Sequence, residues 1–254
     1  MRVISLVPSA TETLAAWGID PVACTRYCER PDLPHVGGTK NPDIAAIAEL
    51  APDLVVVDRE ENRRPDYDAL VAAGIEVEAL HIASLDDVEP ELLRLARRVG
   101  ADWRPEPLPS QSQLPPLRHR GGGDERVRVF VPIWRRPFMS IGAPTYGASL
   151  LAYCGLEVAF ADRPDPYPTL DEADLASEPI DLVLASTEPY PWHRRNLDEL
   201  DAYGPVHLID GQDLFWWGTR TPAAVRRVAD AVAQALSGPT PPAGPAGEAR
   251  AGAQ

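Results

Sequence analysis

Short apolar runs alternate with amphipathic segments along most of the chain. A continuous apolar run such as DLVVVD at 53–58 is typical of a parallel strand buried on both faces. In 86–99, by contrast, apolar residues recur on one face, as in a helix that covers a sheet. The alternation predicts an α/β fold, with strands at 2–7, 53–58, 75–80, 126–133, 157–160, 180–186 and 205–210 and helices at 9–17, 43–50, 66–73, 86–99, 145–154, 171–177, 194–202 and 221–236. Ser9 and Glu12 match an S-x-x-E capping box at the start of the first helix.

The pattern stops once and then restarts. Residues 102–125 contain five prolines and a glycine triplet, which favours a linker over a packed helix or central strand. We therefore predict an N-terminal α/β lobe at 1–101, an inter-lobe linker at 102–125 and a C-terminal α/β lobe at 126–236. The Pro-, Gly- and Ala-rich tail at 237–254 is predicted to be disordered.

The two halves share short motifs at a nearly constant offset. The tripeptide Asp-Leu-Val occurs at 53–55 and again at 181–183, 128 positions later, and DALVAAG at 68–74 resembles DELDAYG at 198–204. Internal duplication and ordinary βαβ patterning both remain open as the cause. The same offset relates Glu60 to Glu188, each of which follows its lobe's central strand. Ligands of open α/β sheets bind at the carboxyl ends of strands, so we expect both residues to face one crevice. The prediction is two Rossmann-like lobes, joined by a single connection, with a ligand cleft between them.

Composition and charge exclude several classes of function. A net charge of −14 disfavours nucleic acid and anionic membrane surfaces as partners, since phosphate binding needs clustered Lys and Arg. No apolar run is long enough for a membrane span. Three cysteines without CxxC spacing fit a reducing compartment. Because MRVISLVPSATET lacks the long apolar region of a signal peptide, we expect a cytoplasmic monomer, or a periplasmic or cell-surface protein if an upstream leader is missing.

The loop TRYCERPDLPHVGGTKNP at 25–42 gathers several reactive residue types. Cys28 and His35 could act as nucleophile and base or bind a metal, but no nucleophile elbow and no third or fourth metal ligand accompanies them. No dinucleotide or P-loop motif is present either. What remains is a set of aromatic residues in loops or at element ends, which suits a large flat ligand or packing between lobes: Tyr27, Phe138, Tyr146, Tyr167, Tyr190, Trp192, Phe215, Trp216 and Trp217.

With these features in place, the chain resembles a known family over most of 2–236. It is similar to the substrate-binding proteins of ABC importers for cobalamin, iron–siderophores or haem, the helical-backbone class, and most similar to the cobalamin binders. The resemblance rests on the segments RVISLVPSATETLAAWG, RYCERP, VGGTKNPDIAAIAELAPDLVVV, RVFVPIWRRPFMSIG and QDLFWWGTRTPAAVRRVADAV.

The resemblance implies a ligand held between the lobes by aromatic residues from both. Tyr27 matches the family's first-lobe aromatic and Phe138 the second-lobe aromatic, while Tyr167 stands where a cobalamin binder has Trp. Asp213, Phe215 and Trp216 fall in the last cleft loop, and the acidic residues Asp43 and Glu172 match positions that dock onto permease arginines.

Three departures accompany the resemblance. Lys40 stands where the cobalamin binder has a Trp, which adds a cation to the cleft. The family's long helix between the lobes is not legible in 102–125, and helix 86–99 could replace it or the hinge could be looser. The missing signal peptide conflicts with capture of a substrate outside the cell.

We therefore predict a binding protein, not an enzyme, for a corrinoid or another metal chelate, with no intrinsic cofactor or protein-bound metal. The predicted ligand-binding residues are Tyr27, Lys40, Glu60, Phe138, Tyr167, Glu188, Trp192, Asp213, Phe215 and Trp216. The alternative is a cytoplasmic enzyme or metal-dependent catalyst on the same fold, with Cys28, Lys40, Glu60 and His35 as its active group. Convergence of Cys28, Lys40 and Glu60 in a small closed pocket would favour catalysis, and a wide aromatic crevice would favour binding.

Overall fold

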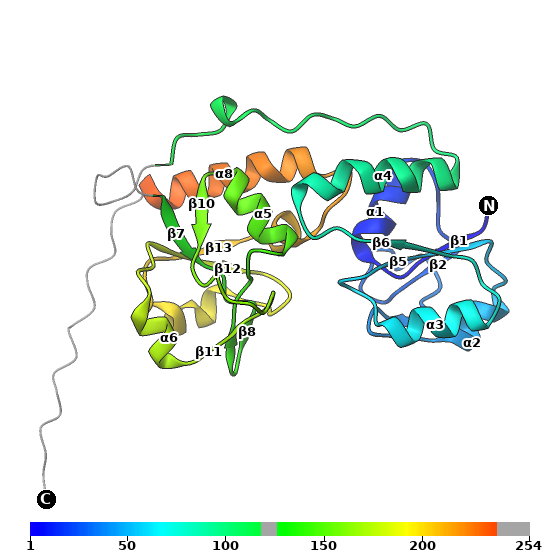
Figure 1. The fold of residues 1–254 in the computed structure, drawn as a ribbon, viewed down its shortest axis with the longest axis horizontal. Helices are drawn as coiled ribbons and strands as arrows, with labels where there is room; N and C mark the ends of the chain where they lie inside the picture. The colour runs from blue at the N-terminus through cyan, green and yellow to red at the C-terminus, as the bar shows by residue number, and fades with distance from the viewer. Residues whose placement is uncertain (118–125, 238–254) are drawn as a thin grey trace, which may run out of the picture.

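The computed structural model describes residues 1–117 and 126–237 and has two α/β lobes that lie side by side (Figure 1). The N-terminal sheet has the order β2 (Ala23–Cys24), β1 (Val3–Ser5), β5 (Leu54–Asp58), β6 (Val77–Leu80). The C-terminal sheet has the order β10 (Leu156–Val158), β7 (Val127–Phe130), β12 (Leu182–Ser186), β13 (Val206–Ile209). All of these pairings are parallel, and the central strands are buried along their whole length, as their continuous apolar runs predict.

The two sheets have equivalent strand orders, with the first strand of each lobe between its second and third. The registers also correspond, because Val55 pairs with Val77 in one lobe and Val183 with Val206 in the other. Asp58 and Ser186, which are 128 positions apart, close the central strands β5 and β12. The prediction of two similar lobes is confirmed, and the loops after these strands occupy corresponding places.

Helices cover both faces of each sheet (Figure 1). In the N-terminal lobe these are α1 (Pro8–Ala16), α2 (Ile44–Glu49), α3 (Arg64–Ala72) and α4 (Leu85–Val99). In the C-terminal lobe they are α5 (Tyr146–Tyr153), α6 (Glu172–Ser177), α7 (Gly211–Phe215) and α8 (Thr221–Ser237), with the 3₁₀ helix η2 (Arg194–Leu200) where an α-helix was predicted. The capping box at Ser9 is wrong: α1 begins at Pro8, a favoured first helical residue, and Ser9 is buried inside the helix.

Smaller elements form the loops around the lobe junction. β3 (Gly37–Gly38) and β4 (Asn41–Pro42) make a short hairpin within 25–42. β8 (Trp134–Arg135), β9 (Phe138–Met139) and β11 (Thr169–Leu170) make a three-stranded antiparallel sheet beside the C-terminal lobe. None of these short strands was predicted, because two-residue strands carry too little pattern to be read.

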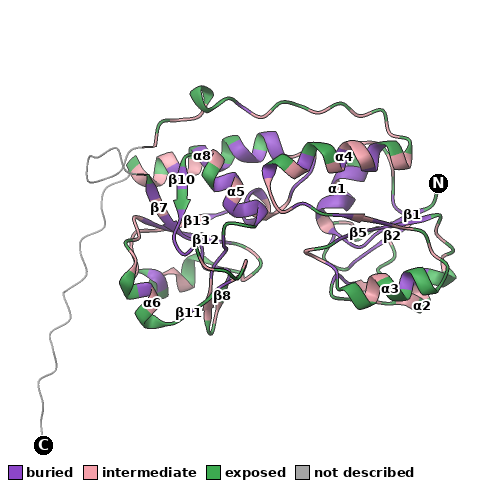
Figure 2. Ribbon diagram, viewed as in Figure 1, coloured by how far each residue is buried: buried purple, intermediate pink, exposed green. Residues whose placement is uncertain are grey.

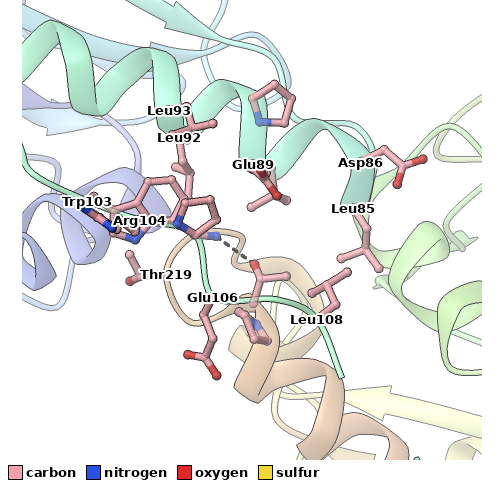
Figure 3. A pocket seen from close by; sticks show the side chains of 16 residues that line it. Leu85, Asp86, Glu89, Leu92, Leu93, Trp103, Arg104, Glu106, Leu108 and Thr219 are labelled. Carbon is pink, nitrogen blue, oxygen red and sulfur yellow. Dashed lines mark hydrogen bonds between the residues drawn. The ribbon is translucent and has the colours of Figure 1, made fainter. Parts of the chain in front are cut away.

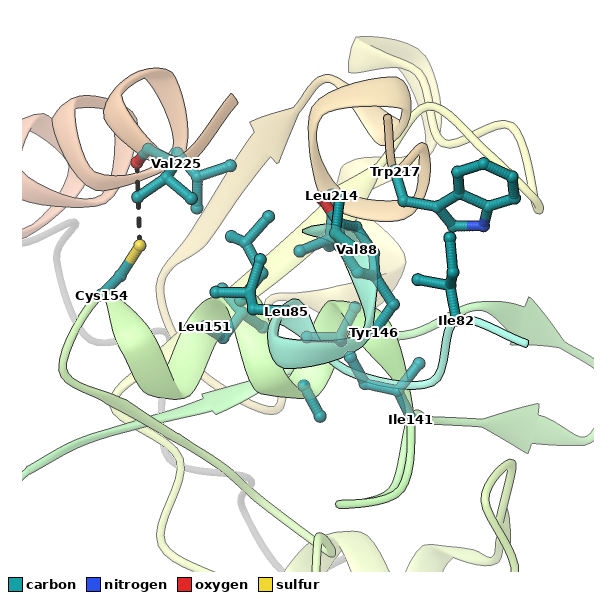
Figure 4. Packing of buried hydrophobic residues seen from close by; sticks show 14 of the residues in the cluster. Ile82, Leu85, Val88, Ile141, Tyr146, Leu151, Cys154, Leu214, Trp217 and Val225 are labelled. Atoms are coloured by element: carbon teal, nitrogen blue, oxygen red, sulfur yellow. Dashed lines mark hydrogen bonds between the residues drawn. The ribbon is translucent and has the colours of Figure 1, made fainter. Parts of the chain in front are cut away.

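One hydrophobic core runs through both lobes at their junction. Ile82, just before α4, and Leu85 and Val88 in its first turn pack in the same cluster as residues of the C-terminal lobe. These are Ile141, Tyr146, Leu151, Leu214 and Trp217, among others (Figure 4). The backbone N–H of Leu85 also donates to Ser149 Oγ of α5, at 3.0 Å. Buried segments therefore continue from α1 and α4 into α5 and α8 (Figure 2). This shared core fixes the relative placement of the two cleft walls.

The predicted linker is partly seen as an extended strap, residues 101–117, that passes over α4 and α8 (Figure 1). It contains one 3₁₀ turn, η1 (Gln111–Gln113), and no long helix. Its partly buried side chains pack on the shared core, with the Trp103 ring 5.4 Å from that of Trp17 and Pro109 O accepting from Tyr153 Oη at 2.8 Å. The rest of the predicted linker, 118–125, and the predicted tail beyond Ser237 lie outside the described residues. No helix of the described chain is long and apolar enough to cross a membrane.

Candidate functional site

A cavity of about 610 Å³ lies between the two lobes, at the carboxyl ends of the central strands. This volume is in the range typical of small-molecule sites. Seven of the ten predicted binding residues line it, namely Tyr27, Lys40, Glu60, Tyr167, Glu188, Phe215 and Trp216, together with Pro8, Thr39, Asn41, Glu61, Ile133, Ile141 and Pro189. A recess of about 80 Å³ shares Glu60, Glu61 and Tyr167 with the cavity and extends to Asp58.

The first wall is the loop 25–42, which folds back on itself. The backbone N–H of Arg26 donates to Gly37 O at 3.0 Å, and the β3–β4 hairpin follows. Gly37 has a φ of +90°, a conformation that favours glycine, and a Cβ on Gly38 would lie 3.0 Å from the Tyr27 ring. The tight hairpin thus holds Tyr27 at the cavity with 56% of its surface exposed and the Arg26 guanidinium 5.3 Å from its ring centre. A ligand could cover this exposed ring by stacking.

The opposite wall comes from the C-terminal lobe and is also aromatic. Tyr167, Phe215 and Trp216 line the cavity from the 165–170 loop and from the end of α7. The Tyr167 hydroxyl lies 3.5 Å from Glu60 Oε2, so it spans the gap between the lobes. Burial, reinforced by the Glu60 charge, raises the pKa of Tyr167, which keeps this phenol protonated at neutral pH. The Trp216 ring lies 5.5 Å from the Arg220 guanidinium.

Acidic side chains occupy the floor between these walls. Asp58 is fully buried at the end of β5, where its Oδ1 accepts the Glu60 N–H at 2.8 Å. Burial raises the pKa of Asp58 to about 7 and also raises the pKa of the neighbouring Glu61. In the other lobe burial, helped by the Asp210 charge, raises the pKa of Glu188 to about 7. Glu60 and Glu188 thus face one cavity, as the repeat offset predicts.

Lys40 lies at the cavity, but its amine is already engaged within the N-terminal lobe. Its Nζ donates to the backbone oxygen of Glu60 at 2.7 Å, and its charge lowers the pKa of Glu61 against the larger effect of burial. Lys40 therefore ties the hairpin to the loop after β5. Its long side chain takes the place of the large aromatic surface expected from a cobalamin binder.

Three predicted residues lie elsewhere. Trp192 as a ligand contact is wrong, because the side chain is fully buried and its indole N–H donates to Pro132 O at 2.8 Å. Phe138 is not among the residues lining the cavity and packs edge-on against Phe130 and Tyr203.

Asp213 is also absent from the cavity lining, and its side chain is buried behind the last cleft loop. It binds two arginines of the neighbouring segment, Arg220 at 3.1 Å and Arg227 at 2.6 Å. Arg220 in turn lies 3.5 Å from Glu12 of the N-terminal lobe. Asp213 therefore anchors a polar network between the lobes and does not contact the cavity.

The residues of the catalytic alternative do not converge. Cys28 is buried outside the cavity lining, with its Sγ 3.1 Å from Thr11 Oγ1 and 3.4 Å from Thr25 Oγ1. His35 is exposed, and its Nε2 lies 3.2 Å from Arg30 O. In the described ranges, no group of three or more His, Cys, Asp or Glu residues is placed to hold a metal ion. The wide aromatic crevice matches the binding prediction.

Sequence reasoning missed Asp58 and Glu61 as parts of the site. Asp58 is the last residue of β5, and Glu61 lies in the following loop that also supplies Glu60. The signal was present, since a carboxylate that ends a continuous apolar strand must lie at the ligand-binding edge of the sheet.

A second cavity, of about 520 Å³, lies away from the cleft (Figure 3). Its walls are α4, the strap and the segment that leads into α8, with Leu85, Leu92, Trp103 and Leu108 among the lining residues. It contains no predicted site residue and shares none with the inter-lobe cavity. Its position beneath the strap reflects the extended chain that stands where the resemblance implies a long helix.

The chain is similar in sequence and in fold to known binding proteins. No family model matches the chain. The vitamin B12-binding protein of Salmonella typhimurium is 29% identical over 72% of the chain and 72% of its own length, and that of Yersinia pestis (strain Pestoides F) is 26% identical over 94% and 88%. The crystal structure of periplasmic vitamin B12 binding protein BtuF of Vibrio cholerae matches with a TM-score of 0.70 and 19% identity over 93% of the chain and 98% of its own length. Periplasmic heme-binding protein BhuT matches with a TM-score of 0.73 and 20% identity over 93% and 99%.

These comparisons contradict the predicted cytoplasmic location. Three solved proteins that share the fold, BtuF, BhuT and a heme-binding protein from Pseudomonas aeruginosa, are described as periplasmic. A leader is removed from a mature secreted protein, so the residues at the start of a chain are weak grounds for assigning a compartment.

The two-lobed fold, the aromatic inter-lobe cavity and the relatives agree with one another. Over most of its length the chain is similar in sequence to vitamin B12-binding proteins, and it shares the two-lobed fold of periplasmic vitamin B12- and heme-binding proteins.

Proposed function

We propose that this protein binds a corrinoid, such as vitamin B12 or a precursor of it, in the inter-lobe cavity and does not transform it. The observation that carries the proposal is the cavity of about 610 Å³ with aromatic side chains from both lobes. Tyr27 from one side and Tyr167, Phe215 and Trp216 from the other offer flat surfaces to a macrocycle. The names of the relatives support the ligand class, since the proteins from Salmonella typhimurium and Yersinia pestis are vitamin B12-binding proteins.

The shared core at the lobe junction supports a binding mode with little rearrangement. α4 and α5 are joined through Leu85 and Ser149, and Gln212 Nε2 of the C-terminal lobe donates to Glu29 Oε1 of the N-terminal lobe at 2.7 Å. Preformed walls reduce the entropy that is lost when a ligand binds. We therefore expect affinity to come from stacking area on a preorganised cavity.

Calorimetric titration with cyanocobalamin, dicyanocobinamide, hemin and a ferric siderophore tests the proposal. Saturable binding of the corrinoids at micromolar or lower concentration is the expected result. A matched control is Val71→Ala on α3, which removes an exposed apolar side chain outside the cavity lining. If hemin or the siderophore binds and neither corrinoid does, the corrinoid assignment is wrong. If no compound binds, the proposed function is wrong.

We also propose that Asp43 and Glu172 dock the loaded protein onto a permease. Both are exposed, Asp43 as the N-cap of α2 and Glu172 as the first residue of α6. α2 and α6 lie on the same side of the two lobes, opposite α4 and α8 (Figure 1). Glu172→Arg should reduce capture by the detergent-solubilised permease of the cobalamin importer from the same organism and leave ligand affinity unchanged. Unchanged capture would remove Glu172 from the docking surface.

A further inference from the structure

The inter-lobe cavity has more negative than positive side chains. Glu60, Glu61 and Glu188 line it, and Lys40 is the one cation among the described residues that do so. Asp58 adds a fourth carboxyl group in the adjoining recess. A ligand that enters the cavity therefore meets acceptor oxygens between two aromatic walls.

Two of these carboxyl groups have an oxygen without a hydrogen-bond partner. Asp58 is fully buried, and its Oδ2 has no hydrogen-bond partner among the described residues, although its Oδ1 accepts the Glu60 N–H. Glu188 Oε1 is likewise buried without a partner and belongs to a side chain that lines the cavity. Buried polar atoms are nearly always paired, so unpaired acceptors at a cavity indicate where ligand donors belong.

Lys40 does not satisfy these acceptors. Its Nζ donates to the backbone oxygen of Glu60 at 2.7 Å, and no ion pair joins it to a carboxylate among the described residues. The side chain is exposed, so much of its charge is screened by water. Two arginines beside the walls are also engaged, since Arg26 lies over the Tyr27 ring and Arg220 binds Asp213. Among the described residues that line the cavity, carboxyl groups therefore outnumber cations by three to one.

We propose that this carboxylate set selects corrinoids whose periphery presents amide N–H donors and rejects those that carry carboxylates at the same positions. The proposal rests on the proposed function and adds the chemical class of corrinoid. Amide groups can donate to Glu188 Oε1 and to the Glu60–Glu61 edge while the macrocycle contacts Tyr27 and Trp216. A peripheral carboxylate would instead face like charges in a partly desolvated site, which opposes binding.

The test compares two ligands with the same ring. Dicyanocobinamide has an amide periphery, and dicyanocobyrinic acid has carboxylates in place of those amides. The cyanide ligands occupy both axial positions of the cobalt, so side chains contact only the ring and its periphery. Calorimetric titration at pH 8 in low salt should give at least tenfold weaker binding of the acid, which corresponds to about 1.4 kcal/mol. Raising the salt concentration should reduce the difference in affinity between the two corrinoids, because salt screens the repulsion between carboxylates.

Three single variants identify the carboxylates that act. Glu188→Gln and Glu61→Gln keep side-chain size and an acceptor oxygen but remove the charge, so each should strengthen binding of the acid and reduce the preference for the amide ligand by threefold or more. Glu49→Gln removes a charge from an exposed position on α2 outside the cavity and should leave the preference unchanged. Thermal unfolding of each variant checks that it is folded.

The outcomes separate this inference from the function on which it rests. Equal affinity for both corrinoids, or a preference that Glu188→Gln and Glu61→Gln leave intact, overturns carboxylate selection while corrinoid binding stands. Tighter binding of the acid overturns it as well. Failure of both corrinoids to bind overturns the proposed function and the inference together.

Discussion

Glu188 makes the stability of the unliganded protein depend on pH in a way that a single substitution can reveal. Burial raises its pKa from 4.5 to about 7 in the folded protein, so the folded state holds its proton at a pH where the unfolded state has lost it. Stability that depends on this group is therefore present at low pH and is lost as the pH rises from about 4.5 through about 7. Above that range the folded protein contains an ionised carboxylate with an unpaired oxygen.

We expect Glu188→Gln to be more stable than the wild type at pH 8 and equal to it near pH 4.5. Each pKa unit corresponds to 1.36 kcal/mol, so the shift from 4.5 to about 7 sets an upper bound of about 3 kcal/mol. Because the side chain is only partly buried, water screens part of this energy, and the expected gain is ~1–2 kcal/mol. The glutamine amide keeps an acceptor oxygen at the same position.

Thermal and urea unfolding of the unliganded protein at pH 5, 6, 7 and 8 measures this difference. For a chain of this size the gain corresponds to a rise of roughly 2–8 °C in Tm at pH 8. Glu49→Gln serves as the control, since it changes the net charge equally at an exposed position. A Tm difference that is the same at pH 5 and pH 8, or a variant that is less stable at pH 8, would refute the reasoning.

Three further substitutions probe the walls and the junction. Tyr27→Ala should weaken corrinoid binding about tenfold and change the free energy of unfolding by no more than about 0.5 kcal/mol, since the ring is 56% exposed. An unchanged affinity in calorimetry would remove Tyr27 from the site. Trp192→Ala should lower the free energy of unfolding in urea by about 3–5 kcal/mol, because it leaves a cavity and removes the donor to Pro132 O. A loss of affinity without a loss of stability would contradict this. Gly218→Ala should cost about 1–3 kcal/mol, because φ is +135° and the added Cβ would overlap Thr13 Oγ1 in the other lobe; a Tm equal to that of the wild type would contradict this.

Much of the fold can be predicted because its strongest signals are local. The run Val55–Val57 is apolar on both faces, and its counterpart 128 positions later has the same character, so both central strands and the shared geometry of Glu60 and Glu188 follow from the sequence. The β3–β4 hairpin and α7 escape prediction because so few residues define each of them.

The local sequence does not determine the direction in which a loop side chain points. Trp192 and Trp216 both lie in loops or at element ends, yet one is buried with its indole on Pro132 O, 60 residues away, and the other lines the cavity. Asp213, like the cleft glutamates, follows a strand in the sequence. It does not reach the cavity, because Arg220 and Arg227 from the following segment bind it. Such outcomes depend on tertiary partners, which periodicity cannot reveal.

Because the two lobes share a core, they can stay associated without an intact covalent link between them. α4 packs on α5, and the segment before α8 packs on α1. These buried contacts hold the lobes together, so the strap is not needed to keep them associated. A chain cut within 101–117 would therefore yield two fragments that remain associated around an intact cavity. Fragments weakened at their junction and expressed separately would reassemble in proportion to the ligand present, which makes this architecture a natural basis for a split-protein reporter of its own cargo.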